Sequence, residues 1–385
     1  MVMYAEQNDL PKTKMSGNTY PVIGSNGIIG YHSEYTTEPP SITIGRSGNT
    51  GNPFIVYGRS WSHNTTLYIK EFKESNPVYV YYLLKTLELS NFAGGSAVPT
   101  LNRNHIHTLE ITVPPLEEQH KIADTLSVVD ARIAENTKIN HHLEQMAQAI
   151  FKSWFVDFEP FADGEFIDSE LGEIPAGWNV QTIEYLAEKV AMGPFGSNIK
   201  VETFVDSGVP IISGNHLRGL YLDELGYNFI TEEHAHRLSN SLVRASDIIF
   251  THAGNIGQVA LIPDDCEYPY YVISQRQFYL RCDKTKALPE YINYFFQSRE
   301  GQGKLLANAT QTGVPSIARP SSHLKGIAVV LPPIEIQLKW FEMVKAMLQS
   351  LNSNRKENKQ IIAIRDYLLP RLMSGEVSLA DLATK

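Results

Sequence analysis

Arginine, asparagine, glutamine and histidine side chains gather in glycine-rich stretches at two places in this 385-residue chain. An arginine can donate two hydrogen bonds to a guanine edge, and an asparagine or glutamine can pair with an adenine edge. The candidate residues are Asn26, Arg46, Ser47, Asn49, Asn64, Asn215, His216, Arg218, His252, Asn255, Gln275 and Arg276. The same residue types form tight turns, and matching turns would recur as readily as matching base contacts. The pattern predicts contacts with DNA bases, with turn formation as the open alternative.

Complete catalytic motifs are absent from the sequence. A phosphate-binding P-loop needs two spaced glycines before its lysine, and Gly303-Lys304 lacks the first of them. Asn52-Pro53-Phe54 lacks the second proline that an adenine methyltransferase motif would carry. A two-metal nuclease needs an aspartate upstream of Glu-x-Lys, but the nearest one before Glu71 is Asp9. These gaps predict a chain without its own ATPase, methyltransferase or nuclease centre.

Metal binding and disulfide chemistry are also disfavoured. Histidines occur in pairs at residues 105 and 107, 141 and 142, and 234 and 236, without carboxylate or cysteine partners at ligand spacing. We expect them to be surface or capping residues. The chain has 2 cysteines, which suits a reducing compartment. No apolar run approaches the roughly 18 residues of a membrane span, and no secretion leader is recognisable, so we expect a cytoplasmic chain without a membrane segment.

The net charge of -9 is unevenly distributed. Residues 111–188 hold 4 Lys or Arg against 15 Asp or Glu, whereas residues 1–110 hold 8 of each class and residues 189–330 hold 13 of each. The acidity therefore belongs to one stretch between two neutral ones. Bulk charge neither supports nor excludes binding to DNA.

A repeat with an offset of 218 residues organises the chain: VPPLEEQ at 113–119 recurs as LPPIEIQ at 331–337. Further matches join VPTL (98–101) to VPSI (314–317), GRSGNTGN (45–52) to THAGNIGQ (251–258), and YPVIGSNG (20–27) to VPIISGNH (209–216). The polar candidates therefore fall in corresponding parts of a duplicated unit, in which a globular stretch is followed by a helix.

Each copy ends in a long helix with a heptad seam. Steps of four and three residues connect Ile122, Leu126, Val129, Ile133, Asn136, Asn140, Leu143, Ala147, Ile150 and Trp154. The second set is Trp340, Val344, Met347, Leu351, Asn354, Asn358, Ile361, Arg365, Leu368 and Leu372, in which Arg365 alone departs from its counterpart, Ala147. Two matched seams predict that the helices pair with each other, although each helix could instead pack only on its own domain.

Short β-branched and aromatic runs, broken by glycine turns, predict two mixed α/β domains with amphipathic helices at 78–88 and 290–300. Residues 157–178 contain no Lys or Arg and are predicted to be a linker. The expected domains are a first recognition domain (1–110), a central helix (111–160), the linker with a second recognition domain (161–330), and a C-terminal helix with a tail (331–385).

The segments VPPLEEQHKIADTLSVVDARIAENTKIN and HLEQMAQAIFKSWFVDF, with their partner LPPIEIQ and the ending RDYLLPRLMSGEV, resemble the specificity subunits of type I restriction–modification systems. The resemblance covers the whole chain. It implies an α/β fold in which two target recognition domains are separated by two long antiparallel coiled-coil helices with pseudo-twofold symmetry. Each domain would then read one half of a bipartite, asymmetric site in double-stranded DNA.

The resemblance also implies partners. Two modification subunits would bind S-adenosylmethionine and methylate adenine, and restriction subunits would supply the ATP- and Mg²⁺-dependent motor and nuclease. No cofactor, metal or catalytic residue is then expected in this chain. Two other interpretations stay open: a self-sufficient DNA methyltransferase or nuclease fragment, which the missing motifs disfavour, and a coiled-coil scaffold that does not bind DNA.

The repeat extends past the second helix. Residues 374–377 (Ser-Gly-Glu-Val) resemble residues 163–166 (Asp-Gly-Glu-Phe), which precede the second domain. Antiparallel helices would return the C-terminus to the first domain. We therefore expect the tail, 374–385, to contact the first recognition domain.

Overall fold

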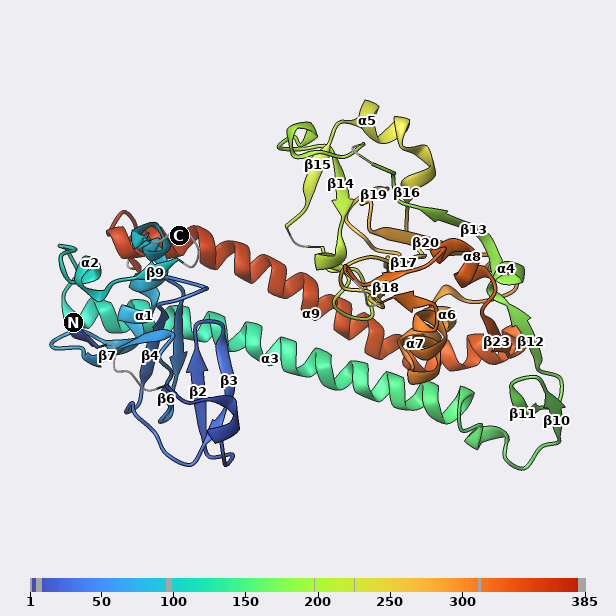
Figure 1. Cartoon of the computed structure of the whole chain (residues 1–385), viewed down its shortest axis with the longest axis horizontal. Helices are drawn as coiled ribbons and strands as arrows, with labels where there is room; N and C mark the ends of the chain where they lie inside the picture. Colours follow the sequence, from blue (N-terminus) through green and yellow to red (C-terminus); the bar gives the residue numbers. More distant parts are fainter. Residues whose placement is uncertain are drawn as a thin grey trace. The chain divides into compact units, whose positions relative to one another are not determined.

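The computed structural model describes residues 2–4, 9–94, 99–196, 198–224, 226–310 and 313–379. The chain divides into two compact units, residues 1–136 with 356–385 and residues 137–355. Both long helices, α3 (Leu116–Phe155) and α9 (Ile334–Ser374), contribute one part to each unit (Figure 1).

The first recognition domain contains two small sheets. One has the strand order β1-β7-β4-β5, with bounds Val2–Tyr4, Thr66–Glu71, Ser41–Gly45 and Pro53–Val56. The other has the order β3-β2-β6, with bounds Gly27–His32, Tyr20–Gly24 and Trp61–Ser62. Strands β2 and β6 run parallel, whereas the other paired strands of these sheets are antiparallel. A short pair, β8 (Ala93–Gly94) and β9 (Thr100–Leu101), completes the domain.

Among the described residues, the second recognition domain repeats this topology and has one additional strand in its second sheet. Its first sheet has the order β13-β20-β17-β18, with bounds Ala187–Met192, Gln277–Cys282, Asp247–Thr251 and Val259–Leu261. Its second sheet has the order β15-β14-β19-β16, with bounds Asn228–Ile230, Val209–Ile212, Tyr271–Ile273 and Leu242–Val243. The pair β14 and β19 is parallel, as β2 and β6 are. The pair β21 (Ala309–Thr310) and β22 (Ser316–Ile317) corresponds to β8 and β9. The predicted duplication of an α/β unit is confirmed.

The second domain has an opening segment for which the described part of the first has no counterpart. Strand β12 (Asn179–Thr182) pairs with β23 (Ala328–Leu331), and α4 (Ile183–Leu186) follows it. Residues 157–178, which were predicted to be a linker, have secondary structure of their own. They form a hairpin of β10 (Phe166–Ser169) and β11 (Gly172–Pro175). Aromatic packing orders this segment, because Trp178 is 4% exposed and contacts Phe155 at 5.9 Å between ring centroids.

Each recognition domain packs one helix against its long-helix segment. The helix is α1 (Pro77–Thr86) in the first domain and α6 (Pro289–Gln297) in the second, and both begin with a proline, which suits the first helical turn. The helix predicted at 290–300 is interrupted, because Ser298 ends α6 and caps the separate helix α7 (Arg299–Leu306). The remaining short helices are α2 (Arg103–His107), α5 (Glu232–Arg237), α8 (Pro320–Lys325), η1 (Lys12–Lys14), η2 (Leu89–Phe92), η3 (Glu159–Phe161), η4 (Val201–Thr203), η5 (Gly214–His216) and η6 (Ser239–Ser241).

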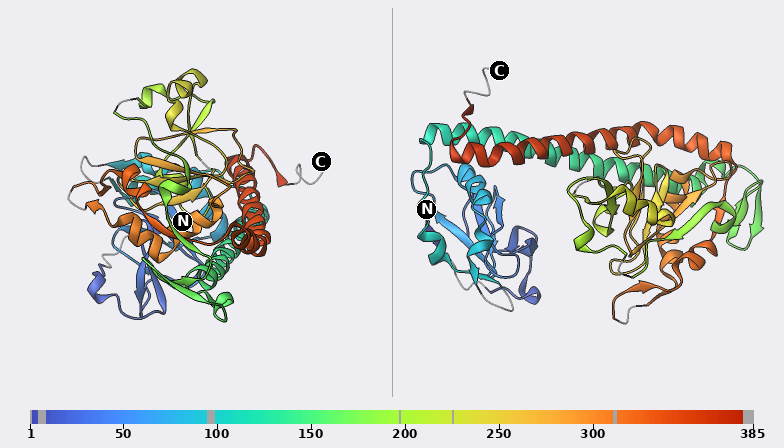
Figure 2. Two further views of the ribbon diagram at one scale, coloured as in Figure 1. Left: turned by 90° about the vertical axis from the view of Figure 1, so that its right-hand side faces the viewer. Right: turned by 90° about the horizontal axis from the view of Figure 1, so that it is seen from above.

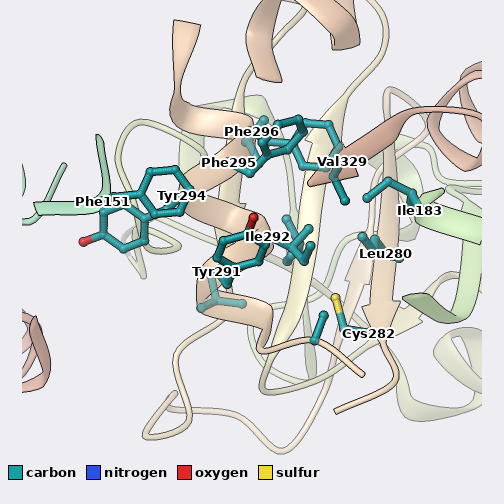
Figure 3. Close-up of a cluster of buried hydrophobic side chains, with 14 of the residues drawn as sticks. Phe151, Ile183, Leu280, Cys282, Tyr291, Ile292, Tyr294, Phe295, Phe296 and Val329 are labelled. Carbon is teal, nitrogen blue, oxygen red and sulfur yellow. The ribbon is translucent and has the colours of Figure 1, made fainter. Parts of the chain in front are cut away.

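The largest core of the second unit joins α6 to both long helices. Phe151 of α3 stacks on Tyr294 at 5.6 Å, and Trp340 of α9 contacts the same tyrosine edge-on at 5.2 Å. Figure 3 shows Phe151 over Tyr294, with Leu280 and Cys282 of β20 in the same cluster. In the first unit, Tyr79, Tyr82 and Leu83 of α1 form the equivalent cluster with residues of α3 and α9.

The two long helices run antiparallel in both units (Figure 2). In the first unit residue 136 of α3 pairs with residue 358 of α9, and residue 130 pairs with residue 365. In the second unit residue 140 pairs with residue 354. All twenty predicted seam positions are buried or half-buried. The heptad prediction and the pairing of the helices are therefore confirmed.

Candidate nucleic-acid interface

Three loops of the second domain meet around a polar cavity of about 250 Å³. They follow β14, β17 and β19, and they carry Asn215, Asn255 and Arg276 of the predicted set. These three residues are exposed. Their donors and acceptors can therefore reach a macromolecule that lies against the loops, as base reading requires.

Buried amides connect the three loops. Gln277 Nε2 donates to Thr251 Oγ1 at 3.3 Å, and Thr251 Oγ1 donates to Gln258 Oε1 at 3.2 Å. Gln258 Nε2 in turn donates to the carbonyl oxygen of Gly214 at 2.9 Å. Gln277 and Thr251 are 1% and 2% exposed. This chain of hydrogen bonds links all three loops and fixes the backbone that presents the exposed residues.

The sequence interpretation missed Thr251, Gln258 and Gln277. The sequence did contain a signal for Gln277, because this polar residue begins a run of residues that is predicted to form a strand. The strand is β20, and the fold buries Gln277 at its start. Burying an amide is costly unless it is hydrogen-bonded, so such a residue indicates a defined polar network.

The first domain builds its loops on the same backbone bonds. The Arg46 N–H donates to the Thr65 carbonyl at 2.8 Å, and the Arg46 carbonyl accepts the Leu101 N–H at 2.8 Å. In the second domain His252 makes both bonds, with Arg276 at 2.9 Å and with Ile317 at 2.8 Å. His252 of the second domain therefore corresponds to Arg46 of the first, and Arg276 corresponds to Thr65.

A further backbone contact also recurs. Ser47 forms an isolated antiparallel β-bridge with Thr100, and its counterpart Ala253 forms one with Ser316. The predicted match of VPTL to VPSI is thus a structural match for residues 100 and 101, whereas Val98 lies outside the described residues. One backbone frame carries different side chains in the two domains.

The predicted reading residues differ in exposure. Asn26, Asn49, Asn215, Arg218, Asn255, Gln275 and Arg276 are exposed, and Arg46, Ser47, Asn64 and His252 are half-buried. Arg218 is not among the residues that line the polar cavity. Some of these residues also have internal partners: Asn64 Nδ2 donates to Asp9 at 3.0 Å, and Asn49 accepts from Asn52.

His216 requires a correction. Its side chain is 4% exposed, its Nδ1 accepts the Ser213 N–H at 2.9 Å, and its ring packs on Tyr227 at 4.5 Å. The open alternative, a turn residue, applies here, and His216 cannot present its ring to a base in this conformation. His252 is intermediate, because Nε2 donates to the Gln275 carbonyl at 3.1 Å and burial lowers the pKa of the ring.

Two glutamines attach the recognition domains to the long helices. Gln119 Oε1 accepts the Asn76 N–H at 3.0 Å, and its Nε2 donates to the Pro114 carbonyl at 2.9 Å. Gln337 repeats both bonds, with Leu288 at 2.9 Å and Pro332 at 2.9 Å. Both glutamines are at most 3% exposed. The last residue of each recurring motif is therefore a connection between α1 or α6 and the start of a long helix.

Seam asparagines pair in the pattern that a twofold relationship requires. Asn136 Nδ2 donates to Asn358 at 2.9 Å in the first unit, and Asn354 Nδ2 donates to Asn140 at 2.9 Å in the second. The offset of 218 residues maps one contact onto the other. A buried asparagine pair fixes register, because a shift would leave amides opposite apolar side chains.

One seam contact breaks this twofold pattern. In the first unit Arg365 Nη1 donates to Asp130 at 2.7 Å, and the Tyr82 hydroxyl donates to the same carboxylate at 2.8 Å. The corresponding residues in the second unit are Ala147 and Leu348, which lie in its apolar cluster. The Tyr294 hydroxyl, the counterpart of Tyr82, finds no hydrogen-bond partner among the described residues.

No metal site or membrane segment appears in the described part of the chain. No group of three or more His, Cys, Asp or Glu residues there could hold a metal ion. Of the histidines predicted to be surface or capping residues, His234 Nε2 bonds the Asn198 carbonyl at 2.8 Å and His105 bonds the Phe92 carbonyl at 3.3 Å. Among the same residues, no helix has the length and hydropathy needed to cross a bilayer.

Two α/β domains thus share one loop frame that carries different side chains, and duplicated contacts join each domain to the paired helices. The chain belongs to the family of the type I restriction modification DNA specificity domain, whose model matches residues 4–145 and 175–363.

Curated relatives agree with this assignment. The chain is 28% identical over 321 residues to the type I restriction enzyme MjaIX specificity subunit of Methanocaldococcus jannaschii, covering 79% of this chain and 70% of that one. It is 23% identical over 364 residues to the HindI specificity subunit of Haemophilus influenzae, covering 78% and 77%. The crystal structure of a type I restriction-modification system S subunit from M. genitalium has a TM-score of 0.59 at 16% identity, covering 96% and 93%, which shows the shared fold.

Proposed function

We propose that this chain reads a bipartite, asymmetric site in double-stranded DNA, with one recognition domain for each half. The observation that carries the proposal is the repeated loop frame, in which Arg46 and His252 make the same two backbone bonds. An arginine and a neutral histidine offer different hydrogen-bonding groups to a base edge. The two halves of the site are therefore expected to differ in sequence.

The reaction chemistry belongs to partner subunits in this proposal. Two modification subunits carry S-adenosylmethionine and methylate adenine, and restriction subunits carry ATP, Mg²⁺ and the nuclease. The names of the curated relatives, each a specificity subunit of a type I restriction enzyme, support this division of labour. The chain itself acts as a non-catalytic reader and assembly subunit.

The test is to express the chain with its modification subunits and to map methylated adenines across a genome. The expected motif has two different specified halves and an unspecified gap between them. A palindromic or continuous motif would contradict the proposal.

Two controls separate the alternative functions. The purified chain, incubated with S-adenosylmethionine and DNA, should transfer no methyl group, whereas a self-sufficient methyltransferase would. A gel shift with and without modification subunits should show specific DNA binding by the complex, whereas a scaffold that does not bind DNA would contribute no specificity.

A further inference from the structure

The segment Gly193–Gly196, directly after β13, holds an aromatic ring in solvent. Phe195 is 77% exposed, although the preceding residue, Pro194, is buried. Exposing a phenyl ring forgoes the favourable transfer of apolar surface out of water. The ring lies on a loop that is bonded to the loops of the candidate interface, so a macromolecule bound there can cover this apolar surface.

Both ends of this segment are tied to the loop that carries Arg276. The Gly193 N–H donates to the Gln277 carbonyl at 2.8 Å, and Gln275 Nε2 donates to the Gly196 carbonyl. A Cβ at residue 193 would lie 2.0 Å from the Ser274 carbonyl oxygen, so glycine alone permits this approach. The backbone on both sides of Phe195 is therefore held against the loop that carries Arg276.

The first domain has no corresponding ring in its sequence. Strand β1 takes the place of β13, and residues 5–19 between it and the next strand contain no aromatic residue. The feature belongs to the second recognition domain alone. It can therefore contribute to the difference between the two half-sites.

We propose that Phe195 is an apolar base contact of the second half-site, which rests on the function proposed above. The phosphates of DNA are charged, whereas the faces of the bases and the thymine methyl group are apolar surfaces that can receive a phenyl ring. A contact of this kind carries sequence information, unlike a contact with phosphate. Phe195 acts next to the hydrogen bonds that Arg276 can donate.

The experiment compares Phe195→Ala with Val201→Ala in the complex with modification subunits. Val201 is 78% exposed and lies a few residues further along the chain, so it matches Phe195 in exposure. Fluorescence anisotropy measures affinity for a specific duplex, and methylation mapping gives the motif. We expect Phe195→Ala to weaken specific binding roughly fivefold to one-hundredfold and to relax one position of the second half only. Phe195→Trp should retain most of the affinity, and Val201→Ala should change neither readout.

Three outcomes would overturn the inference. Equal affinity and an equal motif for both alanine variants would exclude a base contact. A loss of modification subunits in ultracentrifugation, with unchanged DNA affinity of the complex that remains, would assign Phe195 to a protein interface. A lowered melting temperature of Phe195→Ala would indicate a structural role. If instead the unaltered complex yields no bipartite motif, the proposed function itself fails.

Discussion

The side-chain oxygen of Gln119 accepts the backbone N–H of Asn76 at 3.0 Å, which connects the first turn of α1 to the start of α3. Replacing Gln119 with Leu removes this acceptor and the donor to the Pro114 carbonyl. Because each unsatisfied buried group costs about 1–3 kcal/mol, hydrogen exchange should accelerate in the first domain. The second domain should keep its protection. Gln337→Leu is the matched variant and should give the opposite pattern, whereas loss of protection in both domains from either change would contradict separate connections.

The Asp130–Arg365 ion pair predicts a rescue experiment. Asp130→Ala leaves Arg365 and the Tyr82 hydroxyl without their common partner, and we expect a loss of about 1–3 kcal/mol in the first unit. The double variant Asp130→Leu with Arg365→Ala copies the apolar pair of the second unit and should recover most of that loss. Urea unfolding followed by domain-resolved hydrogen exchange measures both. Asp366→Ala, at a more exposed partner of Arg365, should have little effect.

Arg46 and Arg276 should control different halves of the DNA site. Arg46→Ala should relax recognition in the first half, and Arg276→Ala should do so in the second, each at about 1–3 kcal/mol for a bidentate contact. Methylation mapping with each variant complex gives the answer. Arg237→Ala is the control, since this exposed arginine of α5 is not among the residues that line the polar cavity. Uniform weakening on all DNA would show phosphate contacts instead.

The C-terminal segment should stabilise the first domain. Val377 and Leu379 pack against the cluster that contains Tyr79 and Tyr82 of α1. Truncation after Gly375 should therefore accelerate hydrogen exchange in α1 and leave α6 unchanged. The point variant Val377→Ser with Leu379→Ser should act in the same direction, which separates these contacts from residues 380–385, outside the described residues. Equal protection of α1 in all three chains would show that the segment contributes nothing.

Stability should depend on pH through His252. Burial lowers the pKa of this imidazole in the folded chain, so the unfolded state binds its proton more readily. The contribution of His252 to stability is therefore complete well above the ordinary histidine pKa of about 6.5 and decreases as the pH falls through it. Melting temperatures between pH 7.5 and about 5 should fall more steeply for the unaltered chain than for His252→Asn. Identical slopes would show that His252 does not titrate in this range.

Periodic features were predictable from the sequence. Contacts between residues that lie far apart along the chain were not. The seam followed from alternating steps of four and three residues, because burial on a helix repeats with the same period. Residue type alone does not predict that the last residue of each recurring motif, Gln119 or Gln337, is buried, because glutamine is a mostly exposed residue type. Its burial depends on a backbone N–H about 40 to 50 residues away, which no local pattern contains.

The residues of the candidate interface were only partly predictable, because their exposure also depends on contacts between residues that are far apart in the sequence. Asn215, Asn255 and Arg276 were identified by residue type and prove to be exposed around one cavity. His216 has an equally suitable type and adjoins Asn215, but its ring is covered by Tyr227. Turn chemistry and base-reading chemistry use the same residues, so exposure in the fold has to separate them.

The broken symmetry at residues 130 and 365 has an evolutionary consequence. After a duplication, the ancestral pair had to change twice to give a charged pair in one unit and Leu348 with Ala147 in the other. Either single change would leave a half-buried charge without its partner on the other helix. We therefore expect selection to act on positions 130 and 365 jointly, although they lie in different copies of the repeat. In sequences that descend from this chain, residues 130 and 365 should therefore be substituted together or not at all. Such paired substitutions would show that these parts of α3 and α9 have evolved together.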